Sequence, residues 1–161
     1  MAIDLPACVA SNAQMVRLRH VLEMTALLPL FDPHVFGADL VQRVLSPPLD
    51  LFLFAAEHMG TAPARCLVVE DSVTGIQAAR AAGMRVVGFH GGGHCFPGYE
   101  QRLTAAKCCD AFLTAQAFKH DADFIVGGMM LARVARRMSL ITCSAAGFCS
   151  PVFCLIFASF E

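Results

Sequence analysis

The chain has 161 residues, enough for one domain with a buried core but not for a second full domain beside it. Its formal charge of −1, from 12 basic and 13 acidic side chains, excludes the basic surface that nucleic-acid binding requires. Only 16% of the residues are charged and 57% are hydrophobic, so the composition predicts excess apolar surface and, with it, membrane contact, self-association or poor solubility.

Short apolar runs alternate with longer helical segments along the chain. Strands are expected at 7–11, around 35–36, and at 65–72, 85–90 and 110–114. Helices are expected at 12–28, 49–60, 73–84 and 99–109. Strands that alternate with helices in this way predict an α/β fold of three layers, in which helices cover both faces of a parallel, Rossmann-like sheet.

The eight cysteines indicate the compartment. Several lie in apolar runs such as 6–10 and 64–69, where a thiol packs as a small hydrophobic group. We therefore expect reduced cysteines and a cytoplasmic protein. Because no basic region followed by an apolar stretch stands at the start, we expect no secretory signal, or else residue 1 is not the true beginning of the gene product.

Polar residues follow two of the predicted strands. Ser11 and Asn12 come after the first, and the adjacent carboxylates Glu70 and Asp71 come at the end of an apolar run. Ligands of parallel α/β sheets bind where strands end, and hard carboxylate oxygens suit Mg²⁺. A second interpretation stays open, in which Asp71 or Ser72 caps the next helix and binds nothing.

Residues 64–89 resemble the fourth motif region of the haloacid dehalogenase-like hydrolases, in the branch that holds sugar-phosphate phosphatases and β-phosphoglucomutase. The resemblance implies that Glu70 and Asp71 hold a catalytic Mg²⁺. Residues 7–14 resemble the second motif of the family, which implies that Ser11 binds the transferred phosphoryl group and that Asn12 lies beside it. The implied partner is a small phosphorylated metabolite, and the implied core covers residues 1–118.

Two departures from the family pattern concern catalysis. The lysine of the third motif falls on Ser46, and the nearest cation is Arg43. A hydroxyl cannot replace an ammonium group at a phosphoryl site, where electrostatic stabilisation carries most of the catalysis. The first motif, aspartate-x-aspartate-glycine-threonine, supplies the nucleophile and should precede Ser11 together with a cap domain, but only ten residues stand there.

The chain offers no replacement for that nucleophile. Asp4 has no second aspartate two positions later, and Asp121 with Asp123 follows Lys119 and His120 instead of a buried strand. We therefore predict a core truncated at its N-terminus, with no catalytic residue, that is inactive as a phosphatase. The alternative function is that of a non-catalytic relative that binds phosphate or a protein partner.

The resemblance also implies a missing strand. In the family the strand of the first motif lies between the strands that match 8–10 and 67–69 here. Two strand edges would then face a gap whose backbone groups need partners. We expect either that these edges close on each other or that an apolar segment fills the gap, with 123–128 and 139–143 as candidates.

Residues 119–161 are expected to form an apolar C-terminal extension. Within it, residues 138–160 carry no charged side chain and follow Arg133, Arg136 and Arg137. That length suffices for a membrane-spanning helix with its cytoplasmic side at the arginines. Membrane association, packing on the core and an extension without a role all remain open for this segment.

Overall fold

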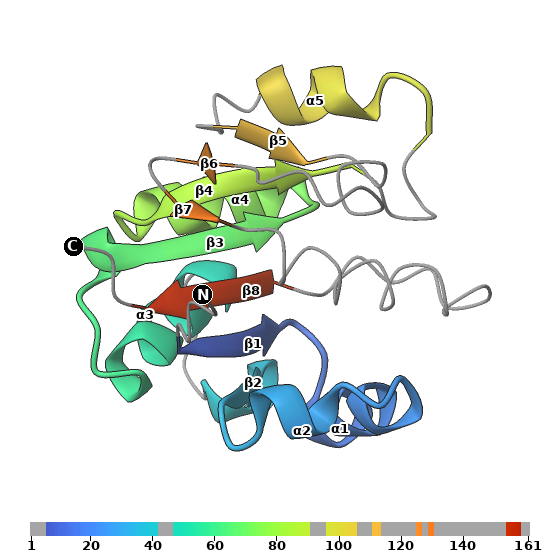
Figure 1. Cartoon of the computed structure of the whole chain (residues 1–161), viewed down its shortest axis with the longest axis vertical. Coiled ribbons are helices and arrows are strands. Elements are labelled where there is room, and N and C mark those ends of the chain that lie inside the picture. The colour runs from blue at the N-terminus through green and yellow to red at the C-terminus, as the bar shows by residue number, and fades with distance from the viewer. Residues whose placement is uncertain are drawn as a thin grey trace.

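The computed structural model describes residues 6–41, 47–90 and 96–105, and further on only the backbone at 111–113, 125–126, 129–130 and 154–158. Six strands form one sheet in the order β2, β1, β8, β3, β4, β5 (Figure 1). Their bounds are Ala7–Ser11 for β1, Val35–Gly37 for β2, Cys66–Glu70 for β3, Arg85–Phe89 for β4, Ala111–Leu113 for β5 and Cys154–Ala158 for β8. A separate two-stranded sheet pairs β6 (Ile125–Val126) with β7 (Met129–Met130).

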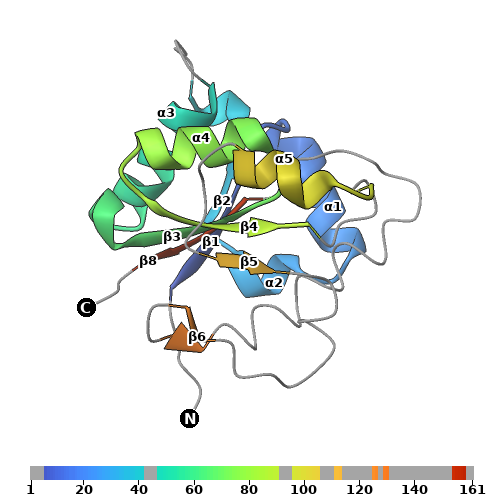
Figure 2. The same cartoon turned by 90° about the horizontal axis from the view of Figure 1, so that it is seen from above.

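Helices cover both faces of the six-stranded sheet (Figure 2). The helices are α1 (Met15–Met24), α2 (Leu28–Phe31), α3 (Pro47–His58), α4 (Val73–Ala81) and α5 (Tyr99–Ala105), with short 3₁₀ turns η1 (Ala38–Leu40) and η2 (Pro63–Arg65). One buried cluster joins the sheet to α3, α4 and α5, and a second joins its other face to α1 and α2. The predicted three-layer α/β architecture is therefore confirmed.

Helix ends differ from the predicted ranges for local reasons. The helix expected over 12–28 ends at Met24, because the Thr25 hydroxyl donates to the Val21 carbonyl (2.8 Å) and Ala26 takes a positive φ of 55°. A short helix, α2, then begins with Pro29 in its first turn, where proline needs no amide partner. Gly60, predicted to close the next helix, has φ +63°, which fits an αL position after the last turn.

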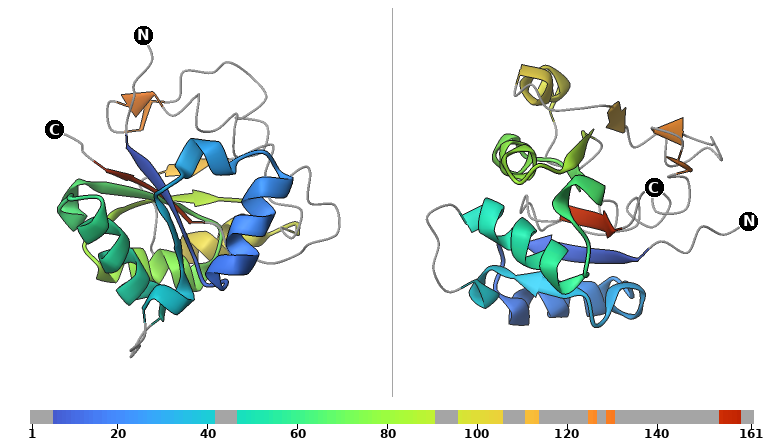
Figure 3. Two further views of the ribbon diagram at one scale, coloured as in Figure 1. Left: turned by 90° about the horizontal axis from the view of Figure 1, so that it is seen from below. Right: turned by 90° about the vertical axis from the view of Figure 1, so that its left-hand side faces the viewer.

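The centre of the sheet is occupied by β8, which is antiparallel to both its neighbours (Figure 3, right). Leu155 pairs with Val9 of β1 on one side and with Val69 of β3 on the other. The remaining pairs in this sheet, β1 with β2, β3 with β4 and β4 with β5, are parallel. Thus the sheet is mixed, and the strand that breaks the parallel pattern lies in the middle instead of at an edge.

The expectation for the gap between β1 and β3 was partly wrong. The two strands do not close on each other, and the filling segment is Cys154–Ala158 instead of 123–128. Within 123–128, Ile125–Val126 pairs with β7 in the separate small sheet. The other candidate, 139–143, lies outside the described residues.

Only part of the apolar extension can be compared with its three interpretations. Cys154–Ala158 is a strand within the sheet, which agrees with packing on the core for these five residues. No helix in the described part of the chain is long and apolar enough to cross a membrane. The remainder of 138–160 lies outside the described residues, so the boundary predicted at 118 stays a prediction.

Two cysteines lie on the strands that flank β8. Cys8 on β1 and Cys66 on β3 have no exposed surface and lie in the cluster beneath α3 and α4. Burial raises the pKa of the Cys66 thiol above its ordinary value, because the charged thiolate would lose its hydration. Both side chains therefore act as small hydrophobic groups, as the sequence indicates.

Removal of β8 is predicted to destabilise the domain strongly. A chain that ends at residue 153 would leave the inner edges of β1 and β3 without partners, and each buried unsatisfied backbone group costs about 1–3 kcal/mol. We expect the free energy of unfolding by urea to fall by at least about 3 kcal/mol. A chain that ends at residue 158 is the control and should unfold like the full chain. Equal stability of the two truncated chains would contradict the central role of β8.

Candidate phosphate and metal site

The candidate site lies at the sheet edge where β1, β3 and β4 end, the edge to which their arrows point in Figure 1. β1 and β3 run in the same direction, since each is antiparallel to β8. Ser11 is the last residue of β1, and Glu70 is the last residue of β3. Because β8 lies between the two strands, the backbones of Ser11 and Glu70 are roughly 10 Å apart, which is two strand spacings.

On the β1 side, a tight turn connects the strand to α1. Ser11 is 3% exposed, and its hydroxyl oxygen accepts a hydrogen bond from the Ala13 amide (3.1 Å). Asn12 beside it is exposed. The turn therefore presents a buried hydroxyl, a donor that suits an anion, next to the start of α1.

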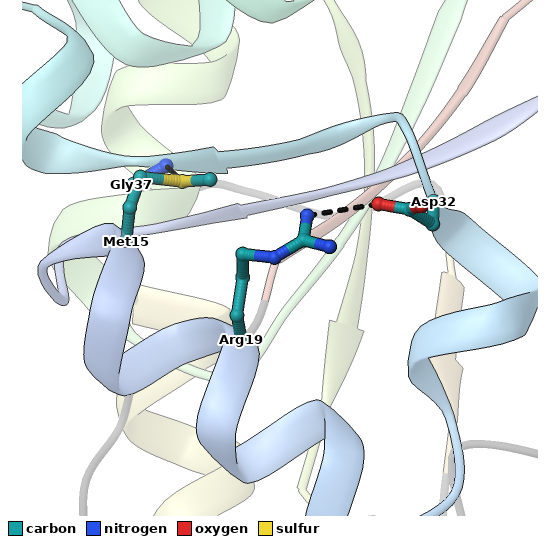
Figure 4. A network of polar contacts seen from close by, with 4 residues as sticks. All are labelled: Met15, Arg19, Asp32 and Gly37. Atoms are coloured by element: carbon teal, nitrogen blue, oxygen red, sulfur yellow. Dashed lines mark hydrogen bonds and ion pairs between the residues drawn. The ribbon is translucent and has the colours of Figure 1, made fainter.

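The segment after β2 holds this turn from outside. The Ala38 amide donates to the Ala13 carbonyl (3.0 Å), and the Asp39 carboxylate accepts from the Met15 amide (2.9 Å). Gly37 lies so close that an added Cβ would be 2.7 Å from the Met15 nitrogen and 2.9 Å from the Ala13 oxygen. Its amide also donates to the Met15 sulfur at 3.0 Å, the contact drawn in Figure 4.

A surface ion pair lies farther along the same face. Arg19 on α1 and Asp32 after α2 are 2.8 Å apart (Figure 4). Their side chains are 38% and 47% exposed, so the pair contributes little to stability. It connects α1 to α2 without reaching the candidate site.

On the β3 side, the Glu70 carboxylate is fixed at the start of α4. Glu70 is 6% exposed, and its Oε1 accepts from the Ser72 hydroxyl (2.6 Å) and the Ser72 amide (3.1 Å). The same hydroxyl oxygen accepts from the Gly75 amide (2.9 Å), which makes Ser72 the N-cap of α4. The capping interpretation is therefore correct for Ser72, and the cap also orients Glu70.

Gly75 has no room for a side chain. A Cβ there would lie 2.7 Å from Cγ of Glu70 and would overlap its Cδ and Oε1. The first turn of α4 thus closes over the Glu70 side chain. Burial of a carboxylate is costly unless donors or a cation stabilise it. The cradle that Ser72 and the first turn of α4 form around the Glu70 carboxylate therefore requires glycine at position 75.

Asp71 follows Glu70 and is held through its backbone. The Tyr99 hydroxyl donates to the Asp71 carbonyl (3.0 Å), and Oδ1 of the Asp71 side chain is buried. Tyr99 stands edge-on to the ring of Phe96, and the Arg102 guanidinium lies 5.6 Å from the Phe96 ring centre and 5.9 Å from that of Tyr99. The start of α5 therefore stabilises the backbone next to the carboxylate pair.

The structure brings Ser11, Glu70 and Asp71 to one edge, as the sequence predicts. Among the described residues, no group of three or more His, Cys, Asp or Glu side chains could hold a metal ion. Two adjacent carboxylates still fit Mg²⁺, which often takes one or two carboxylates and completes its shell with water and phosphate oxygens. The predicted positions Ser46, Arg43, Asp121 and Asp123 lie outside the described residues, as does Asp4.

Sequence reasoning missed Asp39 and Tyr99. Each contacts the site through a backbone group of another element, Met15 for Asp39 and Asp71 for Tyr99. A short polar residue just after a predicted strand signals a cap, but it does not say which helix is capped. No signal in the sequence pairs Tyr99 with the end of β3.

Comparison with known proteins gives one family match. The family model described as haloacid dehalogenase-like hydrolase matches residues 2–83, just over half of the chain. The matched region contains β1, β3 and most of the site, and it excludes β8.

Curated relatives and solved structures agree with this match. The chain is 40% identical to the fructose-1-phosphate phosphatase YqaB of Escherichia coli over 51% of the chain and 43% of that protein. It is 32% identical to the 6-phosphogluconate phosphatase of the same organism over 64% of the chain and 46% of that protein. The chain thus spans less than half the length of these two relatives.

Two crystal structures are similar in fold. A haloacid dehalogenase-like protein of unknown function from Agrobacterium tumefaciens has a TM-score of 0.64 and 42% identity, over 70% of this chain and 50% of that one. A hydrolase of the same family from Deinococcus radiodurans, solved with bound phosphate and sodium, has a TM-score of 0.57 and 35% identity, over 64% and 44% of the two chains.

Substitution of Gly75 is predicted to disturb the Glu70 cradle. In Gly75→Ala the new methyl group would overlap the Glu70 carboxylate, and overpacking of this kind costs about 1–3 kcal/mol. We expect urea unfolding to show a loss in this range. Thr74→Ala, at an exposed position of the same turn, should change stability by less than about 0.5 kcal/mol. Equal effects of the two substitutions would show that the cradle is not tight.

Proposed function

The chain belongs to the haloacid dehalogenase-like hydrolases, and from this premise we propose that it binds a small phosphorylated metabolite and Mg²⁺ without hydrolysing the phosphate. The observation that carries the proposal is the arrangement at the sheet edge. The buried Ser11 hydroxyl ends β1 and the buried Glu70 carboxylate ends β3, and these two strands flank β8, which begins at Cys154. The two groups proposed for binding thus stand at the ends of β1 and β3. The strand between them, β8, begins with a cysteine instead of a carboxylate.

Ser11 is the proposed phosphate ligand. Its hydroxyl has a donor hydrogen for a phosphate oxygen while its oxygen accepts from the Ala13 amide. The turn to α1 adds main-chain amides at a helix start, which favour anions. Asn12, which is exposed beside Ser11, is proposed as a second contact to the same anion.

Glu70 and Asp71 are the proposed Mg²⁺ ligands. Ser72 and Gly75 fix the direction of the Glu70 carboxylate, and Tyr99 fixes the backbone of Asp71. Magnesium bound there would neutralise part of the charge of a phosphate held at Ser11. The two residues supply oxygen ligands, and water and phosphate would complete the shell.

The substrate class is proposed from relatives. Two matched proteins are named for phosphatase activity on fructose 1-phosphate and 6-phosphogluconate, and a solved structure of similar fold has bound phosphate and sodium. A small sugar phosphate is therefore the proposed ligand. The cytoplasmic location expected from the sequence stays a prediction.

The proposed lack of turnover follows from the strand at the centre of the sheet, β8. The family resemblance places the nucleophilic aspartate after the strand that lies between β1 and β3, whereas here β8 runs in the opposite direction and starts with a cysteine. The family's lysine position is Ser46, which lowers the positive charge available to a phosphoryl group. Binding without hydrolysis is the function that these residues support.

Binding and turnover can be separated in one set of assays. We expect titration calorimetry to detect inorganic phosphate binding that requires Mg²⁺ and that weakens about tenfold in Ser11→Ala and in Asp71→Asn, since each removes one charged or hydroxyl contact. Thr104→Ala, an exposed hydroxyl on α5, is the control and should bind like the wild type. With p-nitrophenyl phosphate and Mg²⁺ we expect no hydrolysis. Hydrolysis that disappears in Asp71→Asn would contradict the proposal and favour a phosphatase.

A second candidate function is strand exchange between copies of the chain. The observation that favours it is β8 itself, a strand that lies in the centre of the sheet and outside the family match. The neighbours of β8, which are β1 and β3, are buried on both faces. If β8 left its position between them, their exposed backbone edges would bind another apolar strand. Exchange of identical elements between protomers is a known route to association.

Exchange of β8 can be measured with a labelled peptide. A fluorescent peptide of residues 151–161 should be captured by the full chain, with a rate limited by departure of the resident strand, and fluorescence anisotropy should rise accordingly. A peptide with the same residues in scrambled order is the control. Equal capture of both peptides, or capture of neither, would exclude strand exchange.

A further inference from the structure

The N-terminus of α1 is capped by a residue from a distant segment. Gln14 stands at the N-cap position but makes no side-chain cap, and the first turn contains no acidic residue. The cap comes instead from Asp39 in η1, whose Oδ1 accepts from the Met15 amide at 2.9 Å. A ten-residue helix with its own cap position unused thus depends on a carboxylate that is 24 positions away in the chain.

The same segment holds the preceding turn at two more points. The Ala38 amide bonds to the Ala13 carbonyl, and Ala13 in turn donates its amide to the Ser11 hydroxyl oxygen. Gly37 pairs with Ser11 in the β1–β2 ladder, and its missing side chain lets the two backbones approach. Residues 37–39 therefore hold the turn at Ser11, Ala13 and Met15.

We propose that Asp39 is a positioning residue of the phosphate site, which orders the 11–14 turn by holding the Met15 amide. The inference rests on the proposed function, because it assigns Asp39 a role in the binding of phosphate at Ser11. Asp39 acts through the backbone of α1, and no contact between Asp39 and the ligand is required.

Hydrogen bonding and charge make opposite predictions at this position. The carboxylate bond orders the turn, whereas its negative charge near a bound phosphate opposes an anion. Asparagine keeps an oxygen acceptor for the Met15 amide and removes the charge. The positioning role therefore predicts that asparagine replaces aspartate well and that alanine does not.

The experiment compares substitutions in the full chain with inorganic phosphate and Mg²⁺ as the probe. We expect Asp39→Ala to weaken phosphate binding about tenfold, the size of effect seen when an N-cap bond is lost. Asp39→Asn should bind phosphate within about twofold of the wild type or more tightly. Gly37→Ala, which leaves all charges in place, should weaken binding as Asp39→Ala does, because its methyl group would displace the Met15 and Ala13 backbone.

Two control substitutions separate positioning from general effects. Glu57→Ala removes one carboxylate from an exposed position on α3 and should leave phosphate affinity unchanged. Thr25→Ala removes a hydroxyl bond at the opposite end of α1, so it weakens the helix without touching the turn and should also leave phosphate affinity unchanged. A loss of affinity in Thr25→Ala equal to that in Asp39→Ala would overturn the proposal, since helix stability alone would then explain both.

Amide hydrogen exchange gives a readout that does not depend on phosphate. We expect the Met15 amide to exchange about tenfold faster in Asp39→Ala than in the wild type and at the wild-type rate in Asp39→Asn. Unchanged exchange and unchanged phosphate affinity in folded Asp39→Ala would overturn the proposal, as would equal losses in the alanine and asparagine substitutions. If the wild type binds no phosphate, the proposed function fails, and the Met15 exchange rate still decides whether Asp39 orders the turn.

Discussion

The backbone pairing of β8 with β1 and β3 is the interaction on which the rest of the structure depends. β1 and β3 are buried on both faces, and each pairs on its outer side with β2 or β4. Without a strand between them, their inner edges would face each other across roughly 10 Å, too far for direct hydrogen bonds and too dry for water to replace them. β8 satisfies both edges at once, and the two hydrophobic clusters meet the sheet on either side of it.

The same constraint sets the geometry of the candidate site. The width of one strand separates Ser11 from Glu70, so the proposed phosphate-binding half and the proposed metal-binding half are held at a fixed spacing. Each half is ordered by a helix cap with a close glycine: Ser72 and Gly75 on the β3 side, and Asp39 and Gly37 on the β1 side. In the proposed function the two halves bind ligands, whereas chemistry would require a reactive group from the strand between them.

Several elements could be predicted because their signals are local. The apolar run of β3, the serine cap and the glycine of α4 follow one another within ten residues, so strand, cap and helix were recognisable together. The end of α1 and the existence of α2 were not, because they depend on the positive φ of Ala26 and on the packing of Phe31, the last residue of α2, into the core. Asp39 could not be assigned either, since a capping side chain shows its type but not the helix that it caps.

The α/β class, the family and the sheet end at which Ser11, Glu70 and Asp71 gather could be inferred from the amino-acid sequence, because strand ends and helix caps are signalled by neighbouring residues. The segment that completes the sheet, and the direction in which it runs, became clear only from the folded chain. The apolar stretch 138–160 contains several runs that could form a strand between β1 and β3, where both faces are buried. Hydrophobic periodicity does not distinguish such a buried strand from a buried helix. The position between β1 and β3 requires only an apolar strand with free backbone groups, and both of these strands are far from β8 in the sequence.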